Sequence, residues 1–284
     1  MLGGIWMGLS WLQSLLYGLI SGLTEIFPVS AKAHQALMLR FIGVTDEGNM
    51  TGFVVRATVL MVLFLNCRDH IEQLRREQQL QSLPARRRKR QPDARRVLEL
   101  RMLKSAVVPA LLGFLFYVML RQNDRDLLMI SVFLAFNGIA LFYPQRVRSG
   151  NKDARSMSGF DSILLGISCS LGMIPGLSRI GLVTFAAAVR GADKEHSLNW
   201  ALLLSLPVFL VYLLFDAVAV VSGGNDAFGV MAILGYVLAA LGAFLGASLS
   251  LHMMRSFSRK IGFSGFAYYC WGAALFTFIM YLSI

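Results

Sequence analysis

The fold of this chain is decided by Pro28-Val29-Ser30-Ala31-Lys32-Ala33-His34, which Glu25 precedes, and by Pro175-Gly176-Leu177-Ser178-Arg179-Ile180-Gly181. Each segment places a proline, hydroxyl groups and a cation inside an otherwise apolar stretch. Charge at membrane depth is costly and usually functional. The two segments are therefore the candidate site, and the rest of the chain is interpreted around them.

The composition is that of a polytopic membrane protein. The chain has 284 residues, of which 56% are hydrophobic and 15% are charged, and its mean hydropathy is +0.61. Soluble domains carry about 25% charged residues. The net charge of +11 comes from basic residues that crowd into connecting segments, which is typical of membrane topology rather than of a nucleic-acid surface. Nucleic acid is therefore not an expected partner.

Several common site types are not indicated. The three cysteines, Cys67, Cys169 and Cys270, form no CxxC pair and have no zinc spacing, so we expect neither disulfides nor a structural metal. The sequence has no Walker loop and no dinucleotide-binding glycine pattern. Met1 to Leu23 lacks the basic start and cleavage site of a signal peptide, so it is expected to stay as a membrane element.

Six apolar runs are long enough to cross a bilayer, which takes about 17 to 25 helical residues. They lie near 52–68, 103–121, 127–144, 199–222, 229–252 and 264–283. Two further apolar regions, 5–44 and 160–195, are interrupted midway by the polar segments. Irregular backbone at membrane depth persists only where protein buries it or where it lines a cavity. Both regions are therefore expected to form re-entrant helical hairpins in an all-α membrane protein.

A hairpin followed by three spans occurs twice along the chain. Residues 5–144 and 160–283 are therefore expected to be two repeats within one integral membrane domain, 1–284. Because three spans separate the hairpins, the second repeat is expected to be inverted relative to the first, as in many transporter folds.

Charge orients the repeats through the positive-inside rule. The segment 69–101 is densely basic and is expected to be a cytoplasmic loop, whereas 222–228 has no basic residue and is expected outside. Within the basic loop, 78–96 is expected to be solvated and to contact anionic lipid headgroups. Both termini then lie outside, and the location expected for the chain is a bacterial inner membrane.

The hairpin tips are expected to meet near mid-membrane and to form an anion site, because broken helix ends present unpaired N–H groups to anions. The guanidinium of Arg179 is permanently charged, and its fork suits two phosphate oxygens. Gly176, Ser178 and Gly181 would let backbone and hydroxyl groups approach the same anion. The alternative interpretation of Arg179 is an arginine that reaches from a helix end to the membrane interface.

The first segment supplies candidate catalytic groups. His34 is a candidate nucleophile or proton shuttle, and a buried, hydrogen-bonded histidine is the alternative. Glu25 is expected to orient or deprotonate the imidazole, or to hold a divalent cation against phosphate. The alternative for Glu25 is a carboxylate neutralised by Arg179 or Lys32. Ser30 and Lys32 are expected to bind phosphate.

Other polar residues in apolar stretches have less specific interpretations. Asp216 lies within the predicted span 199–222, where a pairing partner or a cavity position is as good an explanation as chemistry. Asn137 is expected to bond to backbone or to a neighbouring helix. His70, His196 and His252 lie at span ends or in connections, and no role is assigned to them.

At these residues the chain resembles the undecaprenyl-diphosphate phosphatase family. Gly22 to Ser30 together with His34 is similar to the family's first motif, E-G-x-T-E-F-L-P-V-S-S-T-G-H, and Pro175 to Gly181 is similar to its second, P-G-x-S-R-S-G-x-T. Weaker similarity continues through Leu202 to Pro207 and Phe266 to Tyr269. The resemblance implies an inverted-repeat fold, hydrolysis of a C55 isoprenyl diphosphate to the monophosphate, and catalytic positions at Glu25, Ser30, His34, Ser178 and Arg179.

The chain departs from the family pattern within the motifs. Ser21 stands where the family has its first glutamate, and Lys32 stands where it has a threonine. Other family hydroxyl, amide or glycine positions are occupied by Ala31, Ala33, Cys169, Ile180 and Val183. A single carboxylate holds Mg²⁺ less well than two, although waters can complete its coordination. Lys32 adds a cation that is able to replace part of a metal's charge.

Two functions follow. In the first, the protein is a phosphatase in which His34 attacks phosphorus or activates water, Glu25 orients it, and the remaining cations and hydroxyls stabilise the phosphoryl oxygens. Mg²⁺ or Ca²⁺ at Glu25 is the cofactor considered. In the second, the same scaffold binds or transports a polyprenyl phosphate without hydrolysis. The expected partners are a polyprenyl diphosphate and membrane lipids, with a homodimer as the candidate assembly.

Overall fold

The computed structural model describes residues 9–120, 125–146, 150–223, 229–260 and 263–283, and within these ranges the chain forms ten α-helices and no β-strand. The predicted outside placement of the two termini, and most of the segment 222–228, fall outside the described residues. The helices are α1 (Trp11–Ile26), α2 (Ala31–Phe41), α3 (Asn49–Ser82), α4 (Ala94–Leu120), α5 (Leu127–Arg146), α6 (Gly159–Leu171), α7 (Arg179–Val189), α8 (Lys194–Gly223), α9 (Val230–Lys260) and α10 (Ser264–Leu282).

The order of helix lengths repeats along the chain. A pair of short helices, α1 and α2, precedes the longer α3, α4 and α5, and a second short pair, α6 and α7, precedes α8, α9 and α10. The short helices have 16, 11, 13 and 11 residues, fewer than a membrane-spanning helix needs. The two interrupted apolar regions of the sequence are thus helical hairpins, whose polar segments form the tips.

The long helices have the character of membrane spans. Five are long and apolar enough to cross a bilayer: α3, α4, α8, Val230–Ser258 of α9 and Gly265–Leu282 of α10. The apolar part of α5, Leu127–Tyr143, is shorter. Large apolar side chains such as Met119 and Val221 are 77% and 87% exposed, a surface that a lipid environment tolerates and water does not. The chain is therefore an all-helical membrane protein.

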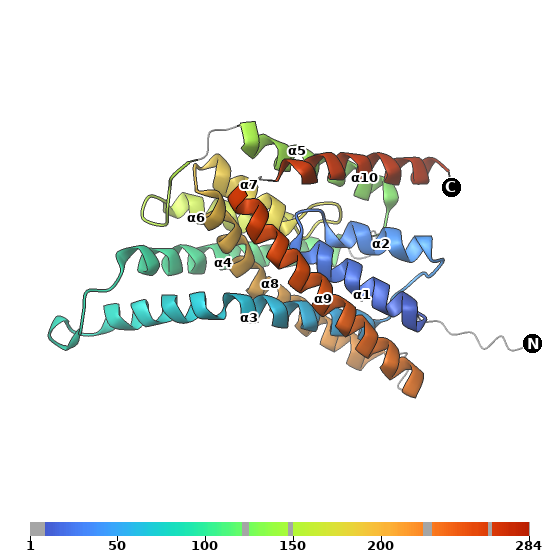
Figure 1. Ribbon diagram of the computed structural model, residues 1–284, viewed down its shortest axis with the longest axis horizontal. Coiled ribbons are helices and arrows are strands. Elements are labelled where there is room, and N and C mark those ends of the chain that lie inside the picture. The colour runs from blue at the N-terminus through green and yellow to red at the C-terminus, as the bar shows by residue number, and fades with distance from the viewer. Residues whose placement is uncertain (1–8, 121–124, 147–149, 224–228, 261–262, 284) are drawn as a thin grey trace, which may run out of the picture.

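The two halves of the chain pack against each other in a symmetric pattern. The first helix of each hairpin lies on a long helix of the other half, α1 on α9 and α6 on α4, while α3 packs on α8 and α5 on α10 (Figure 1). Exchanging the halves leaves this set of pairs unchanged. The core of the bundle is thus formed between the halves rather than within each one.

Small residues allow the close approach of α1 and α9. A Cβ atom on Gly18 would lie 2.0 Å from the carbonyl oxygen of Ala239, and one on Gly22 would lie 2.3 Å from that of Ala243. Glycines spaced by four residues recur on one helix face, which is the pattern that brings membrane helices into backbone contact. This contact holds the first hairpin, and therefore its polar tip, against the opposite half.

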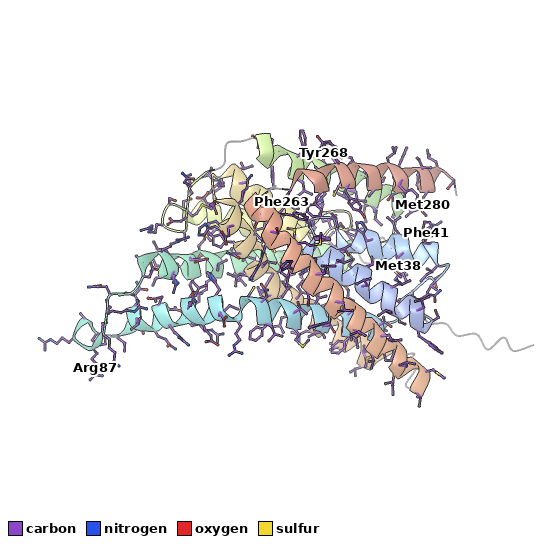
Figure 2. The ribbon with its side chains drawn as sticks, in the orientation of Figure 1. Met38, Phe41, Arg87, Phe263, Tyr268 and Met280 are labelled. Carbon is purple, nitrogen blue, oxygen red and sulfur yellow. The ribbon has the colours of Figure 1, made fainter. Side chains whose placement is uncertain are left out.

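The basic segment 69–101 differs from the expected loop. Helix α3 continues to Ser82 and α4 begins at Ala94, so most of 78–96 is helical or tightly turned, with a short 3₁₀ turn at Ala85–Arg87. Figure 2 places Arg87 at the tip of this α3–α4 hairpin, which extends beyond the other helices. Glutamine, glutamate, arginine and leucine are good helix formers even where hydropathy is low, and this explains the difference.

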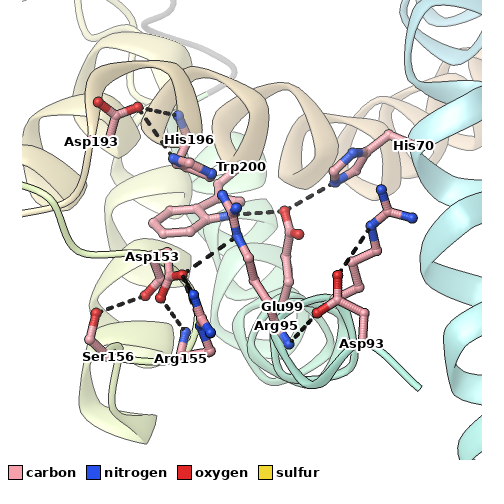
Figure 3. Close-up of polar contacts among 11 residues, drawn as sticks. His70, Asp93, Arg95, Glu99, Asp153, Arg155, Ser156, Asp193, His196 and Trp200 are labelled. Carbon is pink, nitrogen blue, oxygen red and sulfur yellow. Dashed lines mark hydrogen bonds and ion pairs between the residues drawn. The ribbon is translucent and has the colours of Figure 1, made fainter. Parts of the chain in front are cut away.

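A buried carboxylate joins three helices at the base of the α3–α4 hairpin. Glu99 of α4 is 4% exposed and accepts hydrogen bonds from Trp200 Nε1 at 3.0 Å and from His70 at 3.0 Å (Figure 3). A buried carboxylate requires such partners. His70, to which the sequence assigned no role, therefore helps to hold α3, α4 and α8 together. This contact lies away from the polar tips of the α1–α2 and α6–α7 hairpins.

Candidate active site

The structure brings the tips of the two hairpins into direct contact. The Gly176 backbone N–H donates to Ser30 Oγ at 3.0 Å. Asn137 of α5 bonds to both tips, donating through Nδ2 to the Pro28 carbonyl at 2.8 Å and accepting at Oδ1 from the Ser178 N–H at 3.0 Å. The expectation that Asn137 bonds to backbone is confirmed. These bonds fix the two polar segments relative to each other.

The backbone of both tips is unusual at the contact. Gly176 has φ +97°, and a Cβ there would lie 2.5 Å from Phe133 Cβ, so only glycine fits. Ser30 has φ 66°, a value that residues with side chains rarely adopt. Backbone strain of this kind persists where the surroundings fix it, and it is common at functional sites. The bond from Gly176 to Ser30 Oγ is one such restraint.

A small polar cavity lies at the junction of the tips, and we refer to it as the central cavity. Its volume is about 30 Å³, and its lining includes Glu25, Lys32, Ser178 and Arg179. Ser178 caps α7, with its Oγ accepting from the Gly181 N–H at 3.2 Å. Four of the predicted site residues therefore share one cavity, and Gly181 contributes through the cap of the helix that carries Arg179.

Arg179 is the most buried cation of the site. It is 7% exposed, its Nη2 donates to Glu25 Oε2 at 2.5 Å, and its guanidinium carbon lies 4.2 Å from the centre of the Phe209 ring. Its Nη1 is buried without a hydrogen-bond partner among the described residues. Arg179 is thus not an interfacial arginine. A buried guanidinium with a spare donor beside a polar cavity is suited to an anion.

Glu25 has the alternative role considered for it, that of a carboxylate neutralised by a neighbouring cation. Its carboxylate is paired with Arg179, and the structure shows no contact between Glu25 and His34. The expectation that Glu25 orients the imidazole is therefore not met in this arrangement. The pairing instead positions the guanidinium and offsets the cost of burying its charge.

A further cation lines the central cavity, and it was missed in the sequence. Arg56 of α3 forms a two-pronged ion pair with Asp216 of α8, through Nε to Oδ2 and through Nη2 to Oδ1, the latter at 2.9 Å. The two side chains are 11% and 7% exposed. Asp216 therefore has the pairing partner that was one of its two interpretations. The signal for Arg56 was a charge within the predicted span 52–68, whose other charge, Arg68, is its last residue.

A larger polar chamber adjoins the central cavity, and we call it the polar vestibule. It measures about 300 Å³, and its lining includes Lys32, Arg56, Tyr117, Arg125 and Asp216. Lys32 and Arg56 line both spaces. The Lys32 ammonium also lies 4.9 Å from the centre of the Tyr117 ring. The two shared cations therefore lie between the vestibule and the central cavity.

His34 lies apart from the other predicted catalytic residues. It is two residues from Lys32 on α2, and residues at that spacing point to nearly opposite sides of a helix. The imidazole Nε2 lies 2.7 Å from the Tyr269 hydroxyl, and Nδ1 lies 2.7 Å from the Ser30 carbonyl oxygen. His34 thus faces α10, where the sequence pattern alone gave no sign of Tyr269 as its partner.

His34 lines a third space, which we call the apolar groove. The groove measures about 590 Å³ and is lined mainly by apolar side chains of α1, the α1–α2 tip, α9 and α10, among them Leu23, Phe27 and Phe266. Thr24 lines both this groove and the central cavity. The three spaces therefore adjoin in the order groove, central cavity, vestibule, from apolar to polar.

The residues at Glu25 do not fit a resident divalent cation. Glu25 is the one carboxylate of the cavity lining and is bonded to Arg179, while Lys32 and Arg56 add positive charge. Ser21, in place of a second glutamate, is fully buried and does not line the cavity. Mg²⁺ takes several oxygen ligands in near-octahedral geometry. This donor set is therefore poorly suited to the expected Mg²⁺ or Ca²⁺, and metal dependence is left to the phosphate-release assay with and without divalent metal.

The other replaced motif positions lie in the packed interior. Their side chains are at most 1% exposed at Ala33, Cys169, Ile180 and Val183, whereas Ala31 lines the central cavity. At the four buried positions, apolar or weakly polar side chains thus pack around the tips where the family has hydroxyl, amide or glycine residues. Polar character in the cavity is concentrated in the cations.

Together these features define an all-helical membrane protein with a small cavity between two hairpin tips, lined mainly by cations among its charged side chains. The chain belongs to the family described as bacitracin resistance protein BacA, whose family model matches residues 14–276. The resemblance inferred from the two motifs is thereby confirmed.

Three relatives that are 26% to 28% identical to this chain align with more than 90% of its length. An undecaprenyl-diphosphatase of Alkaliphilus metalliredigens is 26% identical over 262 residues, covering 91% of this chain and 94% of the relative. An undecaprenyl-diphosphatase of Methanococcus maripaludis is 26% identical, covering 94% and 98%. Undecaprenyl-diphosphatase 1 of Shouchella clausii is 28% identical, covering 95% and 96%. The similarity thus includes both hairpins and all the long helices.

Proposed function

We propose that this protein hydrolyses undecaprenyl diphosphate, or a similar polyprenyl diphosphate, to the monophosphate. In a cell the reaction would recycle the lipid carrier of bacterial cell-wall synthesis. The observation that carries the proposal is Arg179, a buried guanidinium with an unpartnered Nη1 at the junction of the two family motifs. Membership of the BacA family and the names of the relatives support the same substrate.

The order of the three spaces supports a position for the substrate. The isoprenyl tail would occupy the apolar groove, the headgroup would pass Thr24 into the central cavity, and the rest of the diphosphate would extend toward the vestibule. A groove of this size holds only part of a C55 tail, and the remainder would lie in lipid. The tail would move from lipid into an equally apolar groove, so packing against the groove, rather than removal from water, would hold it there.

The membrane arrangement is part of the proposal. We place six helices, α3, α4, α5, α8, α9 and α10, across the bilayer and the two hairpins as re-entrant elements with inverted orientation. The repeated helix order and the symmetric packing of the halves support this arrangement. The α3–α4 hairpin, with its basic tip, would then be cytoplasmic by the positive-inside rule, the membrane a bacterial inner membrane, and the vestibule at the opposite face.

The chemistry would break the anhydride bond between the two phosphorus atoms, with water consumed and inorganic phosphate released. Arg179 and Lys32 would stabilise charge on the phosphoryl oxygens, with Ser178 and its helix end as further donors. His34 is the proposed nucleophile or base. In this substrate position the phosphorus nearest His34 is the one that carries the tail, so for this role that phosphorus must reach Nε2, where the Tyr269 hydroxyl now bonds.

One assay tests the hydrolysis. Purified protein in detergent is given undecaprenyl diphosphate or a short soluble isoprenyl diphosphate, with and without divalent metal, and released phosphate is measured. We expect release by the wild type and loss of at least about 100-fold in R179A, since positioned charge typically contributes that much. R40Q, at the exposed end of α2, is the control. No release under any condition would contradict the proposal.

A non-hydrolytic binder or transporter of polyprenyl phosphate is the second candidate. The observation that favours it is His34, whose two ring nitrogens are both engaged and which lies outside the central cavity. In vesicles of defined lipid, a transporter should move a polyprenyl phosphate between leaflets and should do so equally well in H34A. A phosphatase should lose phosphate release in H34A. Absence of leaflet exchange would count against transport.

A further inference from the structure

The volume of the central cavity limits what can enter it. At about 30 Å³ it is on the scale of one or two water molecules, so it can receive the oxygens of a single phosphoryl group at most. A diphosphate bound at Arg179 must therefore place its second phosphate elsewhere. The vestibule shares Lys32 and Arg56 with the central cavity and is ten times larger.

Charge favours the same position for the second phosphate. The central cavity is lined by three cations and one carboxylate, and that carboxylate is already bonded to Arg179. In the vestibule the three carboxylates are each paired with an arginine, Asp216 with Arg56 and Asp46 and Glu47 with Arg125. The described vestibule lining thus carries three cations and three carboxylates, whereas the central cavity has an excess of cations. A second phosphate would meet that excess at the edge of the vestibule that Lys32 and Arg56 share with the cavity.

Arg56 is held in a way that suits binding rather than packing. Asp216 bonds Nε and Nη2, the two nitrogens on one edge of the guanidinium. An arginine fixed on one edge by a carboxylate keeps its position without losing its charge, and a fixed fork loses little further freedom when it binds an anion. Asp216 is therefore a positioning residue for Arg56.

We propose that Lys32 and Arg56 form a second phosphate subsite, which gives this protein a preference for diphosphate over monophosphate and supplies the positive charge that a divalent metal would otherwise supply. The inference rests on the proposed function in taking an isoprenyl diphosphate as the ligand. It is motivated by the poor fit of the Glu25 donor set to a resident cation and by the two cations shared between the spaces.

Binding, rather than turnover, tests the proposal. Affinity of the purified protein for farnesyl diphosphate and farnesyl monophosphate is measured by calorimetry in EDTA and in Mg²⁺. The wild type is expected to bind the diphosphate in EDTA, with less than about a threefold change on adding Mg²⁺. R56Q and K32Q are each expected to weaken diphosphate binding about tenfold or more, the range for a charged hydrogen bond, and monophosphate binding by less than about threefold.

The controls separate a binding role from a structural one. R56Q leaves Asp216 buried and unpaired. The double variant R56Q/D216N, which removes both charges, is therefore tested beside it. If neither of these variants folds, the comparison of K32Q with the wild type tests the proposal. R40Q should bind like the wild type. Diphosphate binding that requires Mg²⁺, or equal losses for both ligands in the variants, would overturn the subsite while hydrolysis stands. Failure to bind either ligand under any condition would instead reject the proposed function.

Discussion

The Ser178 N–H donates to Asn137 Oδ1 at 3.0 Å, so that one side chain of α5 holds the start of α7 while its Nδ2 holds the other hairpin tip at the Pro28 carbonyl. Asn137 is fully buried. The amide thus provides a hydrogen-bond partner for the Pro28 carbonyl and for the Ser178 N–H, two main-chain groups outside regular helix. Both lie in the protein interior, where water does not supply such partners. The relative position of the two motifs depends on this contact.

Removal of the Asn137 amide should destabilise the protein. In N137A the Pro28 carbonyl and the Ser178 N–H lose this partner, at a cost of about 1–3 kcal/mol for each group left unpaired. The midpoint of thermal unfolding in detergent should fall. N66A is the matched control, since Asn66 accepts from the exposed Arg255 and its loss should change the midpoint little. Equal midpoints for the two variants would contradict the bridging role.

Glycine is required at position 176 for two separable reasons. G176A places a methyl group at φ +97° and 2.5 Å from Phe133 Cβ, whereas G43A meets a positive φ of +70° with nothing within 4 Å. Strain alone costs about 1–2 kcal/mol. We expect G176A to lose more unfolding free energy than G43A, measured by denaturation in detergent. If G43A were equally damaging, the close approach at the tips would not matter.

The contact between α1 and α9 should be equally sensitive to a methyl group. G22A puts a Cβ atom 2.3 Å from the Ala243 carbonyl oxygen, so the helices must separate. G272A of α10 meets nothing within 4 Å and should be neutral or stabilising by about 0.5–1 kcal/mol. Thermal unfolding in detergent compares them. A stable G22A would show that α1 and α9 are not packed backbone to backbone.

The tip of the α3–α4 hairpin should loosen in acid. Hydrogen bonds from Arg90 and from the Asp93 N–H lower the pKa of Glu77 below its ordinary value of 4.5. A carboxylate whose pKa is lower in the folded state than in the unfolded state stabilises the fold at pH values above its ordinary pKa. This stabilisation is lost as the pH falls through the pKa of the folded state. The hairpin tip should therefore be fixed at neutral pH and should become progressively more mobile as the pH falls below 4.5, the ordinary pKa of the carboxyl group.

A spin label at position 87 measures that change. The native cysteines, Cys67, Cys169 and Cys270, are all buried, so a label on R87C reports on the hairpin tip. Its mobility should rise as pH falls, and E77Q should make it mobile at neutral pH as well. E72Q, which removes the exposed ion pairs to Arg68 and Arg76, should behave like the parent. A label with pH-independent mobility would exclude the role of Glu77.

Much of the helix order could be predicted from the sequence, because apolar runs and their interruptions are local properties. The predicted hairpins and the long helices are present at close to the expected positions. The region 78–96 was the exception. Its helical turns are polar, and hydropathy cannot distinguish a polar helix from a loop, whereas helix propensity would have favoured continuation of α3.

The site was harder to predict where it depends on direction rather than residue type. Both motifs indicated a phosphate site, and Arg179, Lys32 and Ser178 do share a cavity. The grouping of His34 with them overlooked the helical period, which turns His34 away from Lys32. The Arg56–Asp216 pair lies 160 residues apart in sequence. Its existence depends on the packing of α3 on α8, which no local pattern specifies.

The two-sided bond of Asn137 has a consequence for how this sequence can change over generations. A substitution that moves either tip alters the partner of the same amide, so the segments near positions 28 and 178 are not free to vary independently. Because both bonds are to main-chain groups, related chains should keep an amide at position 137 even where the side chains at 28 and 178 differ. The repeats are thus constrained to evolve as one unit, even where their individual motifs have diverged.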